Sequence, residues 1–317
     1  MSRLTNDHLS LEPVIPASGP ALALDFPGLE VGVAEYAEGP TGCTVIHVPA
    51  GANLAVDVRG GSPGWVGDYG WTHAVCLAGG SLHGLESVAG VTAELLARRD
   101  YATGWDQLGL ASGAIIYDYR PRDNAIYPDK ALGRAALRAA APGSFPLGRR
   151  GAGISATVGK GSPIADHEPS GQGAATLAEG PLRLAFFTVV NAVGAVVDRS
   201  GRVVRGYLDP ATGERLTAAA ALRAGSGTPP SPGNTTISIL ATNQAMDRVA
   251  LGQLGRQVHT SMARAIHPFH APTDGDVLFT LSAADLAADA PGALTPMVLG
   301  VLAADLAWDA VLSAVAD

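Results

Sequence analysis

Apolar and polar positions along this chain follow two different periods, and each period predicts a different kind of element. Short apolar runs, several rich in β-branched residues, are typical of strands. Longer stretches in which apolar residues recur every three or four positions are typical of helices. Strands are predicted at residues 31–36, 43–48, 114–117, 151–158, 184–190, 192–197, 235–242 and 277–281. Helices are predicted at residues 79–95, 130–140, 247–266 and 293–316.

The interleaving of strands with long helices predicts an α/β (α+β) fold in which stacked sheets are covered by helices. Residues 21–317 are expected to form a single domain. Residues 1–20 contain three prolines and no clear periodicity, so they predict a loosely ordered N-terminal arm. Residues 209–232 contain proline and glycine throughout, which breaks any regular element, so this segment is expected to be an exposed linker.

Composition narrows the classes of function. The chain has 317 residues, of which 47% are hydrophobic and 16% charged, and its formal net charge is −8. An acidic chain without a basic stripe cannot neutralise phosphates, which argues against nucleic acid as a partner. Residues 184–197 are too short to span a membrane, and Asp305 and Asp309 give the C-terminal helix a polar face. No membrane association is therefore expected.

The two cysteines and the N-terminus indicate a compartment. Cys43 and Cys76 lie in apolar surroundings with no metal-type spacing, which favours buried free thiols in a reducing cytoplasm. The first residues have neither the basic segment nor the apolar segment of a signal peptide. We therefore expect a cytoplasmic protein.

Thr235 is the first candidate for catalysis, because it joins the predicted linker to a predicted buried strand. Its hydroxyl could attack the carbonyl of Asn234, cut the chain there and leave Thr235 as a new N-terminus. The freed α-amine has an ordinary pKa of roughly 7.7–8.0 and could serve as the general base for the same residue's hydroxyl. The alternative is a turn followed by β-branched strand residues. A glycosylation acceptor at Asn234 carries little weight without a secretory signal.

Lys160 is the second candidate, since it lies between two glycines after the predicted strand at residues 151–158. A P-loop is excluded because Gly153 and Gly159 are separated by five residues where that motif has four, and because Gly161 replaces the required Ser or Thr. A surface lysine is the ordinary alternative. Flanking glycines would instead let Lys160 approach a nucleophile closely and hold the protonation state of its neighbour.

Three further polar residues complete the candidate site. Asn191 interrupts an apolar run, so it is either a buried structural hydrogen-bonding group or an oxyanion donor. Asp274 and Asp276 flank Gly275, which allows close backbone approach. They would lie on one side of a strand if the strand predicted at 277–281 began early. They either orient a terminal amine or form a solvated turn. A metal site with His267 and His270 matches no known spacing.

These motifs resemble, in order, the autoprocessing aminopeptidase/amidase family of N-terminal-nucleophile-like hydrolases. The resemblance covers roughly residues 22–317, and more narrowly the chain looks like the nylon oligomer hydrolases. β-Aminopeptidases of the wider family are less similar, because they typically carry a serine and a glutamate at the acidic pair. The closer resemblance is carried by residues 25–28, 38–42, 76–80, 126–134, 257–259 and 308–312.

The resemblance implies a four-layer αββα sandwich and autocleavage between Asn234 and Thr235 into fragments 1–234 and 235–317. It also implies a tetramer of processed units that needs no cofactor or metal. The implied activity is endo-type hydrolysis of 6-aminohexanoate oligomers, and the alternative is a β- or D-aminopeptidase or a D-amino-acid esterase/amidase. In the implied site Thr235 is the nucleophile, Tyr117 lines the substrate site, and the supporting residues are Lys160, Asn191, Asp274 and Asp276.

Overall fold

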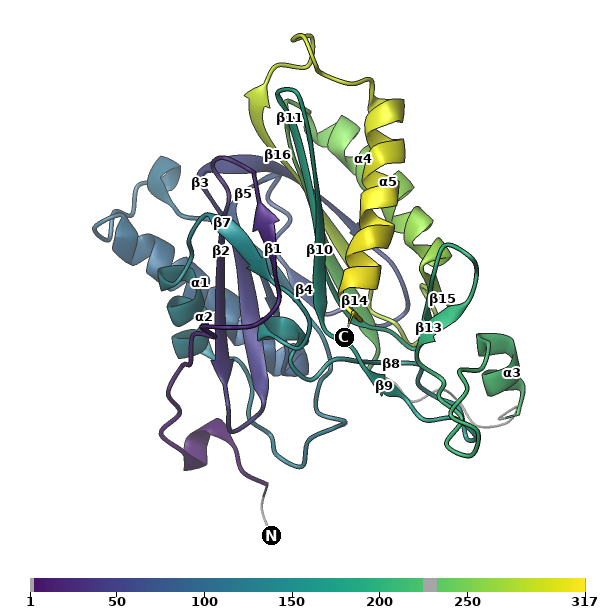
Figure 1. Cartoon of the computed structure of the whole chain (residues 1–317). Helices are drawn as coiled ribbons and strands as arrows, with labels where there is room; N and C mark the ends of the chain where they lie inside the picture. The colour runs from purple at the N-terminus through teal and green to yellow at the C-terminus, as the bar shows by residue number, and fades with distance from the viewer. Residues whose placement is uncertain (1–2, 225–232, 317) are drawn as a thin grey trace.

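The computed structural model describes residues 3–224 and 233–316 (Figure 1). Its main feature is a nine-stranded sheet that bends into two layers, because the 18-residue strand β3 (Thr41–Val58) belongs to both. The first half of β3 pairs with β2 and β5, and its last six residues pair with β16. β3 therefore connects the two layers covalently.

Each layer has its own set of strands. The first layer contains β2 (Glu30–Tyr36), β4 (Trp65–Val66), β5 (Trp71–Ala78) and β6 (Ala111–Ile115) beside the start of β3. The second contains β10 (Gln172–Glu179), β11 (Leu182–Asn191), β14 (Thr235–Gln244) and β16 (Val277–Leu286). Short strands outside these layers are β1 (Ala21–Leu24), β7 (Gly143–Pro146), β8 (Thr157–Val158), β9 (Glu168–Pro169), β12 (Ala195–Val197), β13 (Val203–Arg205) and β15 (Ile266–His267).

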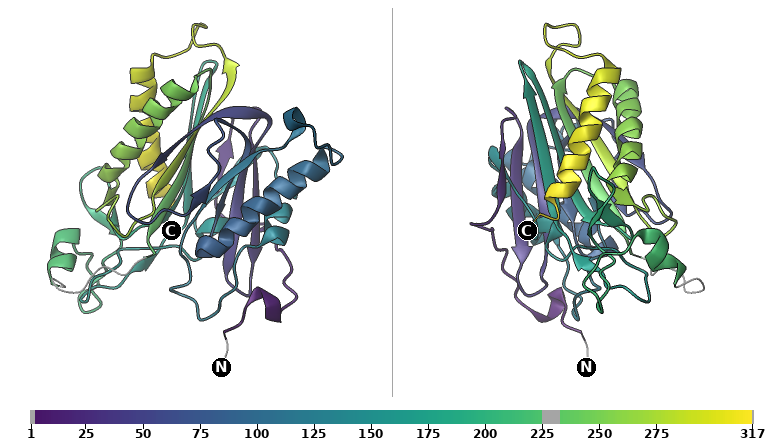
Figure 2. Two further views of the ribbon diagram at one scale, coloured as in Figure 1. Left: turned by 180° about the vertical axis from the view of Figure 1, so that it is seen from behind. Right: turned by 45° about the vertical axis from the view of Figure 1, so that its right-hand side comes forward.

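Helices cover the outer face of each layer, as the views in Figures 1 and 2 show. The first layer is covered by α1 (Glu86–Arg98) and α2 (Lys130–Arg138), and the second by α4 (Arg248–Ser261) and α5 (Pro296–Ser313). A shorter helix, α3 (Ala218–Arg223), lies apart from both pairs. The 3-10 helices are η1 (Asn6–His8), η2 (Ser81–Leu85), η3 (Trp105–Gln107), η4 (Gly151–Gly153) and η5 (Met262–Arg264).

Three apolar cores separate these four layers. The core between the sheets includes Ile46, Phe187 and Ile239, and two further cores lie between each sheet and its helices. Residues of β14 are buried on both faces because one face meets the other sheet and the other meets α4 and α5. The predicted αββα sandwich is confirmed.

Side-chain caps begin three of the predicted helices. Asp129, Asp247 and Thr295 each accept a hydrogen bond from a backbone N–H in the first turn of α2, α4 and α5 respectively. α5 is the one helix among the described residues that is long and apolar enough to cross a membrane. Its apolar side packs into the core and Asp309 on its polar side pairs with Arg199, as in an amphipathic core helix.

Two element predictions were wrong. Residues 151–158 form the 3-10 helix η4 and the two-residue strand β8 instead of one strand, because Gly151 has a φ of +50° that a strand does not allow. The segment 209–232 was expected to lack regular structure, yet it contains α3, whose N-cap is Thr217. Its residues 225–232 lie outside the described residues.

The N-terminal arm hydrogen-bonds to the body of the protein at several points. The carbonyl of Leu4 accepts from the N–H of Ala125 at 2.7 Å, and the side chain of Asn6 donates to the carbonyl of Tyr127. Val14 and Glu35 exchange two backbone hydrogen bonds. Although the arm contains little regular structure, the described residues 3–20 are therefore attached to the first layer.

Candidate active site

The candidate residues meet where three neighbouring strands of the second layer begin or end. β11 ends at Asn191, and antiparallel pairing places Asn191 opposite Thr235, the first residue of β14. β16 runs parallel to β14 with Val277 opposite Ile237, so the residues just before Val277 lie beside the start of β14. The sheet topology thus brings together segments that are far apart in the sequence.

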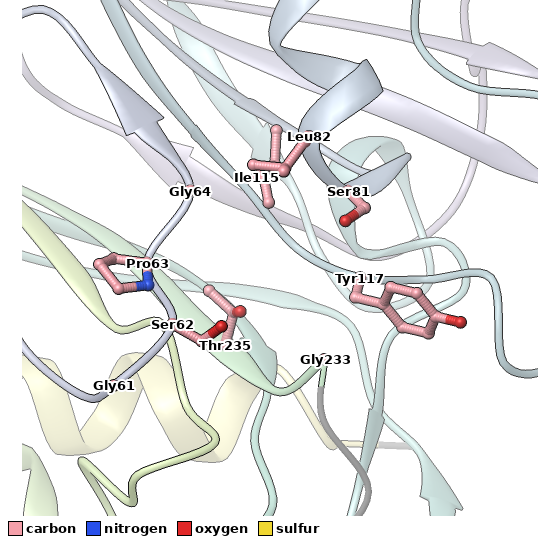
Figure 3. Close-up of a pocket in the computed structure, with 10 residues that line it drawn as sticks. All are labelled: Gly61, Ser62, Pro63, Gly64, Ser81, Leu82, Ile115, Tyr117, Gly233 and Thr235. Carbon is pink, nitrogen blue, oxygen red and sulfur yellow. The ribbon is translucent and has the colours of Figure 1, made fainter.

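Thr235 lines a cleft of about 480 Å³ and is 3% exposed. Figure 3 shows Thr235 near Ser62, with Leu82 and Ile115 across the cleft. The hydroxyl of Thr235 donates to the carbonyl oxygen of Asn234 at 2.5 Å. The predicted nucleophile therefore lies against the peptide bond that it is predicted to cut, and it faces a space open to a substrate.

Gly275 contacts the same peptide bond as Thr235. Its N–H donates to the carbonyl oxygen of Asn234 at 2.9 Å. A side chain at Gly275 would clash, because its Cβ would lie 2.4 Å from the carbonyl oxygen of Ser62. A fixed N–H on the oxygen where negative charge develops is the arrangement of an oxyanion hole. The close backbone approach at Gly275 was predicted, but its role as a donor was not.

Asp274 is fully buried, so its interpretation as part of a solvated turn is wrong. Its carboxyl accepts from the N–H of Ala271 at 2.9 Å and from the N–H of Val193 at 3.3 Å. Burial and, to a smaller extent, the nearby charge of Asp276 raise the pKa of Asp274 to about 7. This carboxyl can therefore exchange a proton near neutral pH.

Asp276 is also fully buried, and it contacts the residue after the nucleophile. One carboxylate oxygen accepts from the N–H of Thr236 at 2.7 Å, and the other accepts from the N–H of His270 and pairs with its Nδ1 at 2.9 Å. β16 begins at Val277, so alternation along a strand does not place the two acids. Backbone N–H groups hold both of them instead.

Lys160 is 2% exposed, so its interpretation as a surface lysine is wrong. Its Nζ donates to the backbone carbonyl and to the side-chain Oδ1 of Asn191, both at 2.8 Å. Burial lowers the pKa of the Lys160 ammonium well below its usual range. The charge of Arg120 lowers it further, whereas that of Asp274 opposes the shift. Lys160 is thus a desolvated amine that bonds to Asn191, the residue paired with Thr235 on the neighbouring strand.

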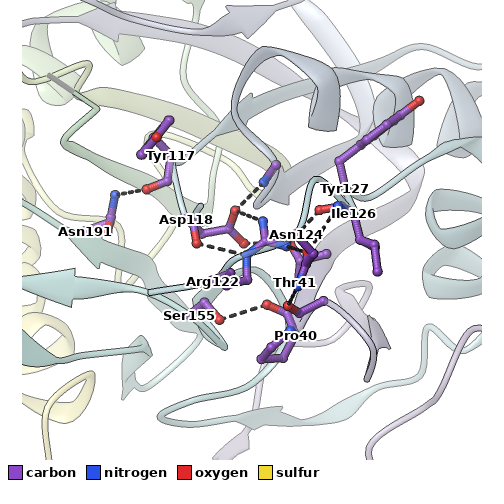
Figure 4. Close-up of polar contacts among 12 residues, drawn as sticks. Pro40, Thr41, Tyr117, Asp118, Arg122, Asn124, Ile126, Tyr127, Ser155 and Asn191 are labelled. Atoms are coloured by element: carbon purple, nitrogen blue, oxygen red, sulfur yellow. Dashed lines mark hydrogen bonds and ion pairs between the residues drawn. The ribbon is translucent and has the colours of Figure 1, made fainter. Parts of the chain in front are cut away.

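Asn191 connects three parts of the site. Its Oδ1 accepts from Lys160 and from the N–H of Thr157, and its Nδ2 donates to the carbonyl of Tyr117 at 3.0 Å, as Figure 4 shows in part. These contacts match the structural alternative for Asn191, and its role as an oxyanion donor stays a prediction. Tyr117 lines the cleft with Thr235, although it follows the end of β6 instead of belonging to the predicted strand.

The structure brings together Thr235, Lys160, Asn191, Asp274 and Asp276, with Tyr117 at the cleft. His270 joins them as the partner of Asp276, and its position shortly before the acidic pair was the only sequence signal. His267 lies in β15. Within residues 3–224 and 233–316, no group of His, Cys, Asp and Glu could hold a metal ion. The arrangement suits attack by a hydroxyl on a carbonyl, with proton exchange by nearby groups.

Comparison with known proteins agrees with this geometry. The sequence profile of peptidase family S58 matches residues 22–317. The chain is 47% identical to a 6-aminohexanoate-oligomer endohydrolase of Agromyces sp. (strain KY5R), over 98% of this chain and 90% of that protein. The protein of the same description from Paenarthrobacter ureafaciens has the same identity and coverage.

A solved structure shows the same fold at low sequence identity. It is the L-aminopeptidase D-Ala-esterase/amidase of Ochrobactrum anthropi, described as a variant of the Ntn hydrolase fold. The TM-score is 0.65 at 17% identity, over 95% of this chain and 88% of that chain. The expected N-terminal-nucleophile-hydrolase fold is confirmed.

Proposed function

Because the chain belongs to peptidase family S58, we propose that it is a self-processing amidohydrolase that cuts 6-aminohexanoate oligomers at internal amide bonds. One observation carries the proposal: the Thr235 hydroxyl and the Gly275 N–H both contact the carbonyl oxygen of Asn234. The substrate class comes from the two relatives at 47% identity that are named endohydrolases of these oligomers.

Self-processing would begin with an N-to-O acyl shift. The Oγ of Thr235 attacks the carbonyl carbon of Asn234, and the Gly275 N–H stabilises the charge that develops on the oxygen. The C–N bond then breaks, and the nitrogen of Thr235 receives the proton that the hydroxyl has lost. Water hydrolyses the resulting ester, which releases Asn234 as a carboxylate and Thr235 with a free amine and a free hydroxyl.

Turnover would use the same atoms on a second amide. The Oγ of Thr235 attacks the substrate carbonyl while the α-amine takes its proton, the leaving amine is protonated, and water hydrolyses the acyl-enzyme. Lys160, through Asn191, would hold the end of β11 against Thr235. Asp276 would hold β14 through the N–H of Thr236. Asp274 would accept or return a proton near neutral pH.

Intact-mass measurement and product analysis test this proposal. The purified chain should separate into fragments 1–234 and 235–317, and the processed protein should release short oligomers early from a long 6-aminohexanoate oligomer. Thr235→Ala should stay a single inactive chain, whereas Thr235→Ser, which keeps a hydroxyl, should retain some processing. Cleavage at another bond, or hydrolysis by Thr235→Ala, would refute the nucleophile assignment.

The products also separate the alternative function. A β- or D-aminopeptidase, or a D-amino-acid esterase/amidase, would release single units from the amino end and would act on alanine amides and esters. Early internal products without such release would support endo-type cleavage.

We further propose that the processed units assemble as a tetramer in the cytoplasm. Cys43 and Cys76 are both buried and free, which suits a reducing compartment. The tetramer rests on the resemblance to the nylon oligomer hydrolases. Analytical ultracentrifugation of the processed protein would test it, and a single monomeric species at micromolar concentration would contradict it.

A further inference from the structure

A second cavity, of about 290 Å³, shares a wall with the cleft that contains Thr235. Tyr117 lines both spaces, so they are neighbours. The second cavity contains none of the residues assigned to the reaction apart from Tyr117. Its position next to the cleft suggests a role in binding parts of the substrate that do not react.

Two segments line both cavities in succession. At the end of β6 and just after it, Ile115 and Tyr117 face the cleft, whereas Tyr117 and Tyr119 face the second cavity. In η2, Leu82 faces the cleft and the next residue, His83, faces the second cavity. The rings of Tyr117 and Tyr119 are 5.6 Å apart. A linear chain leaving the cleft past Tyr117 therefore meets the second cavity next.

The walls of the second cavity are aromatic and held in place. The ring of His83 is 5.5 Å from that of Tyr127 and 6.4 Å from that of Tyr119. The guanidinium of Arg122 lies 4.6 Å from the centre of the Tyr119 ring. Arg122 also pairs with Asp118, as Figure 4 shows. Fixed aromatic faces suit runs of methylene groups, because both are apolar and the rings lose little entropy on binding.

The N-terminal arm contributes a cation to this cavity. Arg3 is the one Lys or Arg among the described residues that line the cavity, and Thr5 also lines it. The arm is held there by Leu4, whose carbonyl accepts from Ala125, and by Asn6, which bonds to the backbone of Tyr127. A guanidinium in the wall of a largely aromatic cavity suits a carboxylate. When an internal amide of a linear oligomer is cut, the leaving fragment is the one that contributes the amide nitrogen. That fragment carries the terminal carboxylate of the oligomer.

We propose that this cavity is a distal subsite for the leaving-side units of a linear 6-aminohexanoate oligomer, with the terminal carboxylate at Arg3. The inference rests on the proposed function and adds how longer oligomers are bound. It also gives the N-terminal arm a task, since truncating the arm would remove the carboxylate partner and one wall.

Calorimetric titration of the Thr235→Ala chain with linear oligomers of two to five units tests binding without chemistry. Affinity should rise with oligomer length. Arg3→Ala should weaken binding of the longer oligomers by about two- to fivefold, as for an exposed ion pair, and leave the dimer unchanged. Amidating the oligomer's carboxylate should remove the difference between Arg3→Ala and its parent. Arg256→Ala, an exposed arginine on α4, is the matched control and should change nothing.

The outcomes separate this proposal from the proposed function. Affinity that does not depend on length, or an equal loss for the dimer in Arg3→Ala, overturns the subsite even if the processed wild-type protein hydrolyses oligomers. Length-dependent and Arg3-dependent binding without any hydrolysis by the processed wild-type protein would support the subsite and refute the proposed reaction. The absence of binding for every oligomer would also overturn the subsite, and the proposed reaction would then stand or fall on hydrolysis by the processed wild-type protein.

Discussion

Asp118 and Asp274 are both completely buried carboxylates, but their surroundings differ. Asp118 pairs with Arg122 at 2.6 Å and accepts from the hydroxyl of Thr41 and the N–H of Gly80 (Figure 4). Arg122 in turn donates to the carbonyl of Ile126 and to Asn124. This cluster ties the segment 118–126 to the loop around residue 40 by buried hydrogen bonds.

Asp274 has no cation at hydrogen-bonding distance among its described contacts. Backbone N–H groups hold its carboxyl, Asp276 repels its charge, and the ammonium of Lys160 is bonded to Asn191 instead. The first cluster pairs its charges and stabilises the fold. The second keeps a carboxyl and an amine desolvated, with their pKa values shifted toward neutrality, as active sites do.

Replacing each buried cation by methionine should affect stability and processing to different degrees. Arg122→Met leaves the Asp118 charge buried without its partner, so the free energy of unfolding should fall by about 3–5 kcal/mol. Lys160→Met removes a desolvated charge whose direct partners are neutral oxygens, so it should lower stability less but abolish processing. Urea denaturation and intact mass measure the two effects. Both variants should be made in the Thr235→Ala background for the stability comparison, since that chain stays uncut.

If Lys160→Met lowered stability as much as Arg122→Met and still processed normally, the distinction between the two clusters would be lost.

Gly275→Ala should slow processing by about 10²–10³-fold, which is the usual effect of losing one oxyanion donor. The new Cβ would lie 2.4 Å from the Ser62 carbonyl oxygen, so the backbone must shift and move the N–H away from Asn234. The fraction of cut chain against time measures the rate. Gly252→Ala in α4 is the control, because nothing lies within 4 Å of its Cβ, and it should process normally. Equal rates for the two variants would remove Gly275 from the mechanism.

The pH dependence of stability should show the raised pKa of Asp274. This carboxyl titrates near 3.8 in the unfolded chain and near 7 in the folded protein. Its contribution to the free energy of unfolding is therefore complete below about pH 4 and is lost as the pH rises to about 7. The loss is at most about 1.4 kcal/mol per pH unit. Relative to its parent, the uncut Thr235→Ala chain, the variant that also carries Asp274→Asn should become more stable across this range.

The informative quantity is how the difference in unfolding free energy between the Asp274→Asn variant and its parent changes with pH. A constant effect of the substitution on stability does not enter this quantity, and the amide that it introduces does not titrate, so any change with pH comes from Asp274 in the parent. Urea denaturation at about pH 5, 6, 7 and 8 measures it. A difference that is constant over this range would mean that Asp274 has an ordinary pKa in the folded protein.

The sequence by itself determined most of the elements and the residue that begins β14. The runs at residues 184–190, 235–242 and 277–281 are apolar enough to be buried strands, and each lies within a strand of the second layer. Local patterns suffice here because strands buried on both faces are nearly continuous apolar runs, interrupted at residues 235–242 only by small hydroxyl residues such as Thr236 and Ser238. The same logic failed for residues 151–158, where the positive φ of Gly151 begins the 3-10 helix η4 and leaves a strand of only two residues.

Tertiary structure decided how the polar groups act. The Gly275 N–H on the Asn234 carbonyl, the bonds from Lys160 to Asn191 and the pairing of His270 with Asp276 depend on strand order and register. No local pattern encodes which strand ends become neighbours, because pairing between distant segments is set by the packing of whole layers. The pKa of Asp274 also depends on that packing, since desolvation comes from residues throughout the fold.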